Sequence, residues 1–416
     1  MKNTLFKFTL ILAGVIAIFG LTGCGNGGGN KKKKSKPAVA YMVAHTANAK
    51  LINSSVPILQ DTMVDCAENY GYTFIVRVDG EPELVSSNNL DIDDQFKNAS
   101  KERLKTDARN KATNLLQQLD DVKAVHPEVD YLEGLRLSAA SLRSLDNSYT
   151  SKTIICCGTG LGTTGYLNFK NNLLSTDPKV IVKLLKDRDA LPNLKGITVY
   201  WVGMGQVEEP QEKLTPKQTK NLQAIWKALV EASGGEFVPN DYITAASKEK
   251  KENKLPAVSV VDIPADKPIA FESKFLKTNS DGNAFKDPMV LSEKQIKFVS
   301  DKANYLYPKN AIKTIQPIAQ YLTNHKSLKL LLVGSTAGDV TDASGIKLSK
   351  DRADTVKNTL IKLGADSKQI VTIGMGSGDP WHIKNAGYKG EAASSNRKVV
   401  LIDAKTEQAQ EILKSQ

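Results

Sequence analysis

Short apolar runs alternate with amphipathic helical patterns through residues 37–245, and this alternation constrains the fold more than any other feature of the chain. The runs Val39 to Ala44, Tyr72 to Val78, Thr153 to Cys157 and Gly196 to Val202 are typical of buried strands. Segments with apolar residues at helical spacing separate them. Strands that alternate with helices indicate a mostly parallel sheet covered on both faces. We therefore predict an α/β domain over residues 37–245.

The last helix of this domain carries the clearest boundary signals. Thr215 is predicted to cap it, Pro216 to occupy its first turn and Gln218 to complete a capping box. Gly234 and Gly235 are predicted to stop it.

A change in composition marks the end of the first domain. The charged run 248–254 is followed by spaced prolines, which is typical of a linker. We place the linker at residues 246–289, with short edge strands possible at 258–263 and 269–271.

A second, smaller domain is predicted over residues 290–405, followed by a C-terminal tail at 406–416. Apolar runs predict strands, and 3.6-residue spacing predicts two helices between them. One helix follows Pro308, and the other begins between Ser344 and Ser349 and ends at Gly364. The predicted strands are Gln295 to Val299, Leu328 to Val333, Ile370 to Ile373 and Lys398 to Ile402. This pattern predicts an α+β domain with a β-α-β-α-β core.

The first residues have the features of an export signal. Basic residues precede a short apolar stretch, and Leu21-Thr22-Gly23-Cys24 resembles the bacterial lipobox, whose cysteine receives a lipid. We predict a lipoprotein signal peptide at 1–23, lipid attachment at Cys24 and a Gly/Lys tether at 24–36. The alternative is an ordinary secretory cut beside an incidental cysteine. The prediction places the protein on the extracytoplasmic face of the cell membrane, anchored by lipid without spanning the bilayer.

The net charge of +11 is partly that of the leader and the tether. An exported, lipidated chain rarely meets nucleic acid, so we expect no nucleic-acid partner and attribute the excess charge to an anionic envelope. The four histidines are scattered, which gives no support for a metal site. Cys66, Cys156 and Cys157 are expected to be buried apolar residues, although a bridge from Cys66 to one of the other two is possible.

The sequence contains no motif that indicates an enzyme. Gly160 to Gly165 forms a G-x-G-x-x-G string, but no helix opens directly after it, so turn glycines are favoured over a nucleotide site. No serine–histidine–aspartate pattern, paired catalytic acids or P-loop is present. We expect a protein that is not an enzyme and uses no cofactor.

The order of elements in the first domain is similar to that of a von Willebrand factor A-like domain, a Rossmann-like fold. In that family a D-x-S-x-S motif after the first strand holds a metal, with help from a later aspartate. Here the first motif position is Ala44, and Gly158-Thr159 stands where the late aspartate is expected. A hard divalent ion needs oxygen ligands, usually carboxylates, so the resemblance implies the fold without the metal.

The second domain resembles the OmpA-like peptidoglycan-binding family. Its signature is G-H-T-D, then N-x-x-L-S-x-x-R-A-x-x-V, then G-x-G-x-x-x-P and N-R-R-V. This chain matches it in order and spacing: Gly334, Thr336, Leu348-Ser349, Arg352-Ala353, Val356, Gly374, Gly376, Pro380 and Asn396 to Val399.

The resemblance implies a ligand and residues that bind it. The family's arginine takes a carboxylate of the diamino-acid stem of peptidoglycan, and its aspartate takes an amine. Arg352 matches the arginine, whereas the aspartate position is Ala337, so Asp339 or Asp342 would have to supply the acid from a shifted loop. Thr336 and Asn396 are further candidates from the motif.

Alternative interpretations of these residues remain. Arg352 could instead form a structural ion pair with Asp339 or Asp351. The pair Trp381-His382 could line a sugar-facing surface, although such a pair more often packs under a loop.

These features favour a lipid-anchored envelope protein that tethers membrane to cell wall, with the first domain as a recognition or assembly module for an unidentified protein partner. The alternative is a protein–protein scaffold whose OmpA-like domain has lost peptidoglycan binding.

Overall fold

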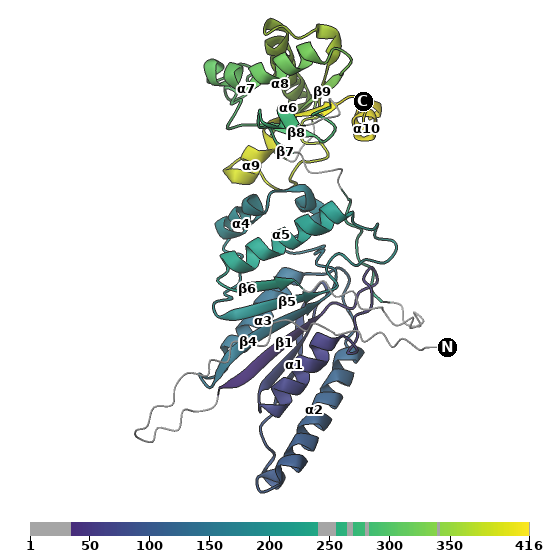
Figure 1. Ribbon diagram of the computed structural model, residues 1–416, viewed down its shortest axis with the longest axis vertical. Helices are drawn as coiled ribbons and strands as arrows, with labels where there is room; N and C mark the ends of the chain where they lie inside the picture. Colours follow the sequence, from purple (N-terminus) through teal and green to yellow (C-terminus); the bar gives the residue numbers. More distant parts are fainter. Residues whose placement is uncertain (1–34, 240–254, 264–268, 279–282, 339–341, 416) are drawn as a thin grey trace, which may run out of the picture. The chain divides into compact units, whose positions relative to one another are not determined.

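The computed structural model describes residues 35–239, 255–263, 269–278, 283–338 and 342–415, which form two α/β domains, each with its own sheet (Figure 1). The predicted leader, Cys24 and most of the tether lie outside the described residues, as does Asp339. Within the described part of the chain, no helix is long and apolar enough to cross a membrane.

The N-terminal domain is built on a six-stranded sheet in the order β3-β2-β1-β4-β5-β6. Its strands are parallel except for β3, which pairs antiparallel with β2 at the edge. The strands are β1 (Lys36–Val43), β2 (Tyr72–Arg77), β3 (Glu83–Asn89), β4 (Tyr149–Cys157), β5 (Ile197–Val202) and β6 (Glu236–Pro239). The predicted mostly parallel sheet is therefore confirmed.

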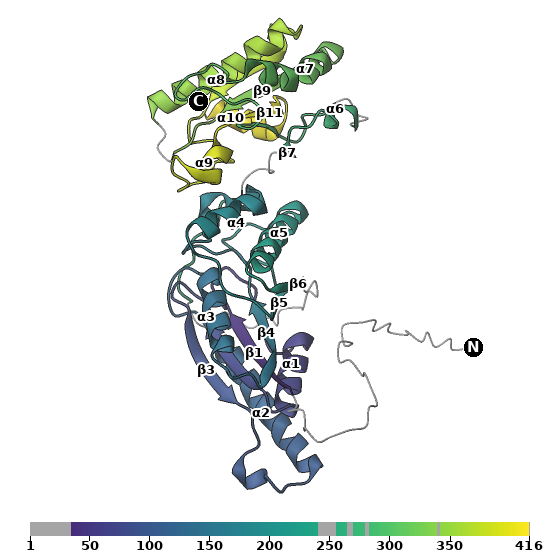
Figure 2. The same ribbon diagram turned by 90° about the vertical axis from the view of Figure 1, so that its left-hand side faces the viewer.

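Helices cover both faces of this sheet because successive side chains of a strand point to opposite faces. Val39, Tyr41 and Val43 of β1 pack toward α1 (Pro57–Glu68) and α2 (Lys101–Asp121). The alternate residues of β1 pack toward the helices of the other face. Those helices are α3 (Tyr131–Arg143), α4 (Pro178–Asp187) and α5 (Pro216–Ala232). Figure 2 shows α1 and α3 on opposite sides of β1 and β4. Short 3₁₀ turns complete the domain at Asp94–Phe96, Phe169–Asn171 and Leu173–Ser175.

Both ends of α5 follow the sequence prediction. The Thr215 hydroxyl accepts from the Gln218 amide, and the Gln218 side chain accepts from the Thr215 amide, which completes the capping box. Gly234, just past the helix, has a φ of 85°, a conformation that glycine adopts without steric cost.

The predicted linker region contains packed segments. Residues 255–263 run along the N-terminal domain, where the Gln211 side chain accepts from the Val261 amide at 2.8 Å and donates to its carbonyl at 2.9 Å. The following segment contributes β7 (Ile269–Ala270) and α6 (Phe275–Thr278) to the C-terminal domain. The edge strand expected near 269–271 is present, whereas 258–263 packs without joining a sheet.

The C-terminal domain holds a five-stranded sheet in the order β10-β9-β11-β8-β7. Its other strands are β8 (Met289–Ser292), β9 (Leu330–Gly334), β10 (Ile370–Gly374) and β11 (Lys398–Asp403). The strand predicted at 295–299 is wrong, since the ladder ends at Ser292 and the chain then turns. Only Phe298 in that stretch forms a bridge, to Tyr305.

Helices also lie on both faces of the second sheet. Leu330, Leu332 and Leu401 pack against α7 (Pro308–Asn324) and α8 (Ala343–Lys362), which lie together in Figure 1. The opposite face is covered by α10 (Glu407–Lys414) and by Trp381. A 3₁₀ turn (Ser367–Gln369) precedes β10, and α9 (Gly390–Asn396) precedes β11.

The three described cysteines are buried and free, so the possible bridge from Cys66 is not formed. Cys66 and Cys157 belong to the core on one face of the first sheet, and Cys156 to the core on the other. Burial raises the pKa of Cys66 and of Cys157 to about 12, which keeps these thiols protonated and unreactive.

Candidate functional site

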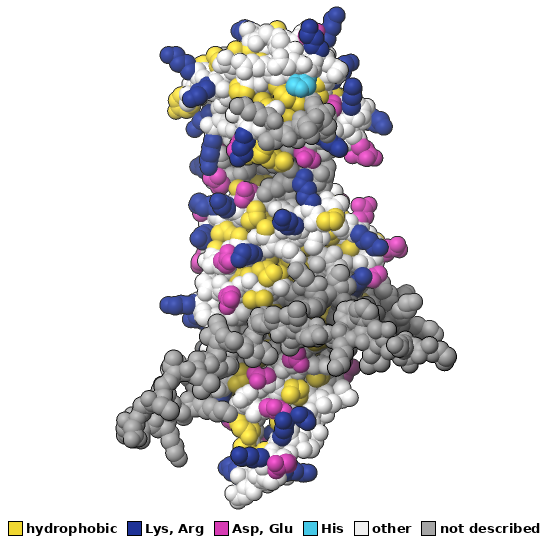
Figure 3. Space-filling view, in the orientation of Figure 1, with side chains coloured by type: hydrophobic (Ala, Val, Ile, Leu, Met, Phe, Trp, Pro, Cys, Tyr) yellow, Lys and Arg dark blue, Asp and Glu magenta, His cyan; other side chains and the backbone are white. Residues whose placement is uncertain are grey.

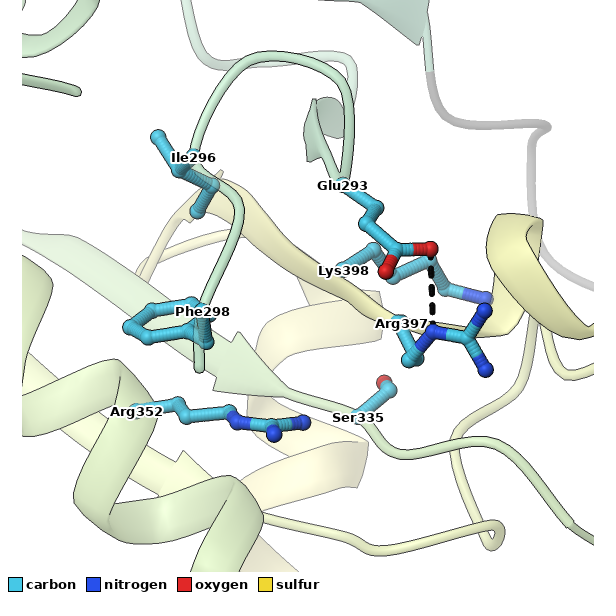
Figure 4. A pocket seen from close by; sticks show the side chains of 7 residues that line it. All are labelled: Glu293, Ile296, Phe298, Ser335, Arg352, Arg397 and Lys398. Carbon is cyan, nitrogen blue, oxygen red and sulfur yellow. Dashed lines mark hydrogen bonds and ion pairs between the residues drawn. The ribbon is translucent and has the colours of Figure 1, made fainter. Parts of the chain in front are cut away.

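A small pocket with a cavity volume of about 20 Å³ lies at one end of the second sheet. It is lined by Glu293, Ile296, Phe298, Ser335, Arg352, Arg397 and Lys398 (Figure 4). Two of the lining side chains are arginines and one is an acid, so the pocket is suited to a small charged group.

Strand register brings three parts of this pocket together. In the antiparallel pairs, Lys398 of β11 lies opposite Ser292 of β8, and Val399 lies opposite Gly334 of β9. Glu293, which follows β8, and Ser335, which follows β9, therefore flank the start of β11 at Arg397 and Lys398. The Ser335 amide donates to the Lys398 carbonyl at 3.0 Å, which extends the ladder into the pocket wall.

Helix α8 supplies Arg352 because it packs directly on the ends of two strands. Ser349, Arg352, Ala353 and Val356 form its buried face, at the spacing of one side of a helix. A Cβ at Gly334 would lie 2.0 Å from the Ser349 carbonyl oxygen, so this close approach needs glycine. The contact places the Arg352 side chain beside the pocket.

Two contacts within the domain fix the position of the Arg352 side chain. Arg352 is buried, its Nε donates to the Lys302 carbonyl at 3.1 Å, and its guanidinium lies over the Phe298 ring at 5.2 Å. Burial lowers the pKa of Arg352, an effect that the nearby Asp301 opposes, and an arginine stays charged after such a shift. Its Nη atoms make no hydrogen bond to the described residues, and Figure 4 shows the guanidinium pointing toward the lining residues opposite. The interpretation of Arg352 as a partner of Asp351 is wrong, since Asp351 pairs with Lys347 at 2.7 Å.

Arg397 faces the same pocket from the opposite wall. Its Nε donates to Glu293 Oε2 at 2.9 Å, and that oxygen also accepts from the Ser394 hydroxyl at 2.7 Å. The pair is partly exposed, with 29% of the arginine side chain and 19% of the glutamate side chain accessible.

The charge of Lys398 is balanced by a buried ion pair with Asp379. Its Nζ lies 3.2 Å from Asp379 Oδ1 and donates to the Trp381 carbonyl at 2.8 Å. Burial by itself would raise the pKa of Asp379, but the charge of Lys398 and the contacts with His382 and Ser335 together outweigh it, and the pKa falls to about 2. The available charges of the pocket are thus those of Arg352, Arg397 and Glu293.

Other residues predicted for the site lie elsewhere. Asp342 caps α8: its carboxylate accepts from the Gly345 amide at 2.6 Å and from the Ser344 hydroxyl at 2.8 Å. The Gly345 hydrogen bond lowers the pKa of Asp342. Thr336 is nearly buried beside the pocket but does not line it. A ligand contact by either residue stays a prediction, as does one by Asp339.

Asn396 and the Trp381-His382 pair have structural contacts. The Asn396 side chain accepts from the Ile383 amide and donates to the Ile383 carbonyl, both at 2.9 Å. Trp381 and His382 are 4% and 1% exposed, so they pack under a loop and form no sugar-facing surface.

The strand ends of the N-terminal domain form a packed polar cluster. The indole N–H groups of Trp201 and Trp226 donate to the carbonyls of Gly158 and Gly160, each at 2.9 Å. The Thr46 hydroxyl donates to Asn48 Oδ1 at 3.1 Å. These contacts hold the glycine-rich loop from inside, and the described residues contain no group of three or more histidine, cysteine or acidic side chains that could hold a metal.

Comparison with known proteins places the C-terminal domain in a family. The model of the OmpA family matches residues 298–397, so the C-terminal region of this chain carries an OmpA-family domain, as its motifs predicted. A curated relative, the peptidoglycan-associated lipoprotein of Buchnera aphidicola subsp. Baizongia pistaciae, is 32% identical over 105 residues. That match covers 25% of this chain and 57% of the relative's length.

Solved structures are similar to about a quarter of the chain. The peptidoglycan-associated lipoprotein from Burkholderia pseudomallei shares 24% identity, covering 26% of this chain and 86% of that one, with a TM-score of 0.23. An outer membrane protein from Borrelia burgdorferi shares 25% identity, covering 28% and 87%, with a TM-score of 0.21.

Proposed function

We propose that this chain is a lipid-anchored envelope protein that binds peptidoglycan non-covalently through its C-terminal domain and so tethers membrane to cell wall. The observation that carries the proposal is the pocket that Phe298, Ser335, Arg352 and Arg397 of the OmpA-family match help to line. There the Arg352 Nη atoms make no hydrogen bond to the described residues and lie beside a second arginine. The relative named peptidoglycan-associated lipoprotein supports it.

The pocket chemistry suits a stem-peptide carboxylate. A guanidinium offers paired N–H donors that match a carboxylate in a bidentate arrangement. Phe298 and the Lys302 carbonyl fix Arg352 before any ligand arrives, which reduces the side-chain entropy lost on binding. No catalytic role is proposed for the pocket.

The anchor belongs to the same proposal. Leu21-Thr22-Gly23-Cys24 supports lipid attachment at Cys24 after removal of residues 1–23. The lipid and the lysines of the tether would hold the protein at an anionic membrane on its extracytoplasmic face. Among the described residues on the face seen in Figure 3, Lys and Arg side chains are spread among acidic ones and form no continuous stripe for nucleic acid.

We assign the N-terminal domain a role in recognition or assembly with an unidentified protein partner. Its strand order, with a single antiparallel edge strand, supports a von Willebrand factor A-like fold. Ala44 stands at the end of the first strand where that family has its metal-binding aspartate, so the proposed interaction is independent of a metal.

The test is co-sedimentation of the full chain, in detergent, with purified diaminopimelate-type sacculi. Arg352→Ala and Arg352→Lys should both lower the bound fraction, the latter because lysine keeps the charge but loses the paired donors. A charge-assisted hydrogen bond contributes about 1.5–3 kcal/mol, so the affinity should fall by about ten- to hundredfold. Arg143→Ala is the matched control, since Arg143 is exposed on α3 in the other domain.

Two results would contradict the proposal. Wild-type protein that stays in the supernatant would favour the alternative function, a scaffold whose OmpA-family domain has lost peptidoglycan binding. Equal sedimentation of wild type and both Arg352 variants would remove Arg352 from the binding site.

A further inference from the structure

The family places an acid in the loop after β9, and this chain has Ala337 there. Asp342, farther along the same loop, is engaged as the cap of α8. The pocket nevertheless contains a carboxylate: Glu293 enters it from the end of β8, on the wall opposite Arg352 (Figure 4).

The Glu293 carboxylate is only half engaged. Both of its hydrogen bonds, from Ser394 and from Arg397, go to Oε2. Oε1 makes no hydrogen bond to the described residues, and the side chain keeps 19% of its surface accessible. One oxygen is therefore fixed by the protein while the other remains available to a ligand.

The electrostatic arrangement is that of a receptor for both signs of charge. Arg352 and Arg397 provide two cations, Glu293 provides one anion, and the pair Lys398–Asp379 is internally neutral. Beside Asp301, both Arg397 and Glu293 influence the pKa of Arg352, so these groups interact electrostatically across the pocket. A simple carboxylate would satisfy the arginines and leave Glu293 Oε1 without a partner.

We propose that Glu293 is a specificity-determining residue that takes the ammonium group of an amino-acid end, while Arg352 and Arg397 take its carboxylate. This inference rests on the proposed peptidoglycan binding and assigns the acid of the site to β8. The chemical class recognised is a carbon that carries both an ammonium and a carboxylate, as at the free end of a diaminopimelate stem residue.

The existing Glu293–Arg397 pair makes this exchange physically reasonable. In the free protein Glu293 and Arg397 neutralise each other. Neither charge is therefore desolvated without a partner, which would destabilise the folded state. Arg397 already donates to Glu293 and, through Nη1, to the Tyr388 carbonyl at 3.3 Å. On binding, the ligand carboxylate gives Arg397 a further acceptor, and the ligand ammonium gives Glu293 a donor for its available oxygen. No charge enters the pocket without an opposite charge beside it.

The experiment measures binding of two probe peptides to the full chain in detergent by isothermal titration calorimetry. One is L-alanyl-γ-D-glutamyl-meso-diaminopimelate, and the other is the same peptide acetylated on its distal amine. Glu293→Gln should weaken binding of the free-amine peptide by about tenfold or more and leave binding of the acetylated peptide unchanged. Arg352→Lys should weaken binding of both.

Glu391→Gln is the matched control, because Glu391 is an acid of the same domain that pairs on the surface with Lys294 at 3.2 Å. It should bind both peptides as wild type does. Equal weakening of both peptides by Glu293→Gln would show that Glu293 only positions Arg397, and no weakening would show that it has no part in binding. Either result overturns the inference while peptidoglycan binding stands. A wild-type chain that binds neither the peptides nor sacculi would remove the proposed function, and this inference with it.

Discussion

Replacing Asp379 by asparagine should destabilise the C-terminal domain in a way that depends on pH. The Asp379 and Lys398 side chains are 0% and 5% exposed, so Asp379→Asn leaves a buried ammonium without its counterion. Breaking a buried pair from one side costs about 3–5 kcal/mol. We expect a loss of that size in the free energy of unfolding at pH 7.

The pH dependence follows from the lowered pKa. Asp379 has a pKa of about 2 in the folded protein, against about 3.9 for an aspartate in an unfolded chain. A lowered pKa stabilises the folded state above the unfolded value, and this contribution is lost as the pH falls toward 2. A pKa shift of this size contributes about 2–3 kcal/mol to the free energy of unfolding. The difference in that free energy between wild type and Asp379→Asn should therefore shrink by the same amount between about pH 5 and pH 2.

Hydrogen exchange of the β11 amides, followed by mass spectrometry on the full chain, reports the stability of this domain separately from the other. Asp351→Asn is the control with the same change of charge, because Asp351 pairs with Lys347 at the surface. It should change the free energy of unfolding by less than about 1 kcal/mol. Two results would refute the reasoning: equal protection of the β11 amides from exchange in wild type and Asp379→Asn, or a difference in protection that does not change with pH.

Two further predictions concern the anchor and the site. Cys24→Ser should leave the leader uncut or move the protein out of the detergent phase, because thioether lipidation needs the sulfur; maturation and phase partitioning like wild type would contradict the lipobox. Ala337→Asp should change the affinity for the free-amine peptide little in the wild type, where Glu293 already supplies the acid, and should restore part of the binding lost in Glu293→Gln. Calorimetric titration with the free-amine peptide measures the effect of Ala337→Asp in both backgrounds. A large gain in affinity in the wild-type background would indicate that the site otherwise has no acid.

The sequence predicts the N-terminal fold well because its signals are local. The buried strands and the capping box of α5 each depend on residues close together in the chain. The edge strand β3 was missed because its burial pattern is almost wholly exposed, and it carries no apolar alternation to detect. The predicted strand at 295–299 failed for the opposite reason: Ile296 and Phe298 are apolar because they face the pocket and the core, where the chain has already left the sheet.

Some residues of the candidate site could be predicted from nearby sequence, whereas others depend on contacts between distant parts of the chain. Arg352 could be found because the helical spacing of α8 and the motif around it lie within one segment. Glu293 could not, because its position depends on the antiparallel register of β8 with β11, which puts it beside Arg397 far along the chain. Asp342 was a reasonable candidate by distance along the loop, but the unpaired amides at the start of α8 attract the same carboxylate. Asp342 therefore serves the helix, and Glu293, which strand pairing brings beside Arg397, faces the pocket.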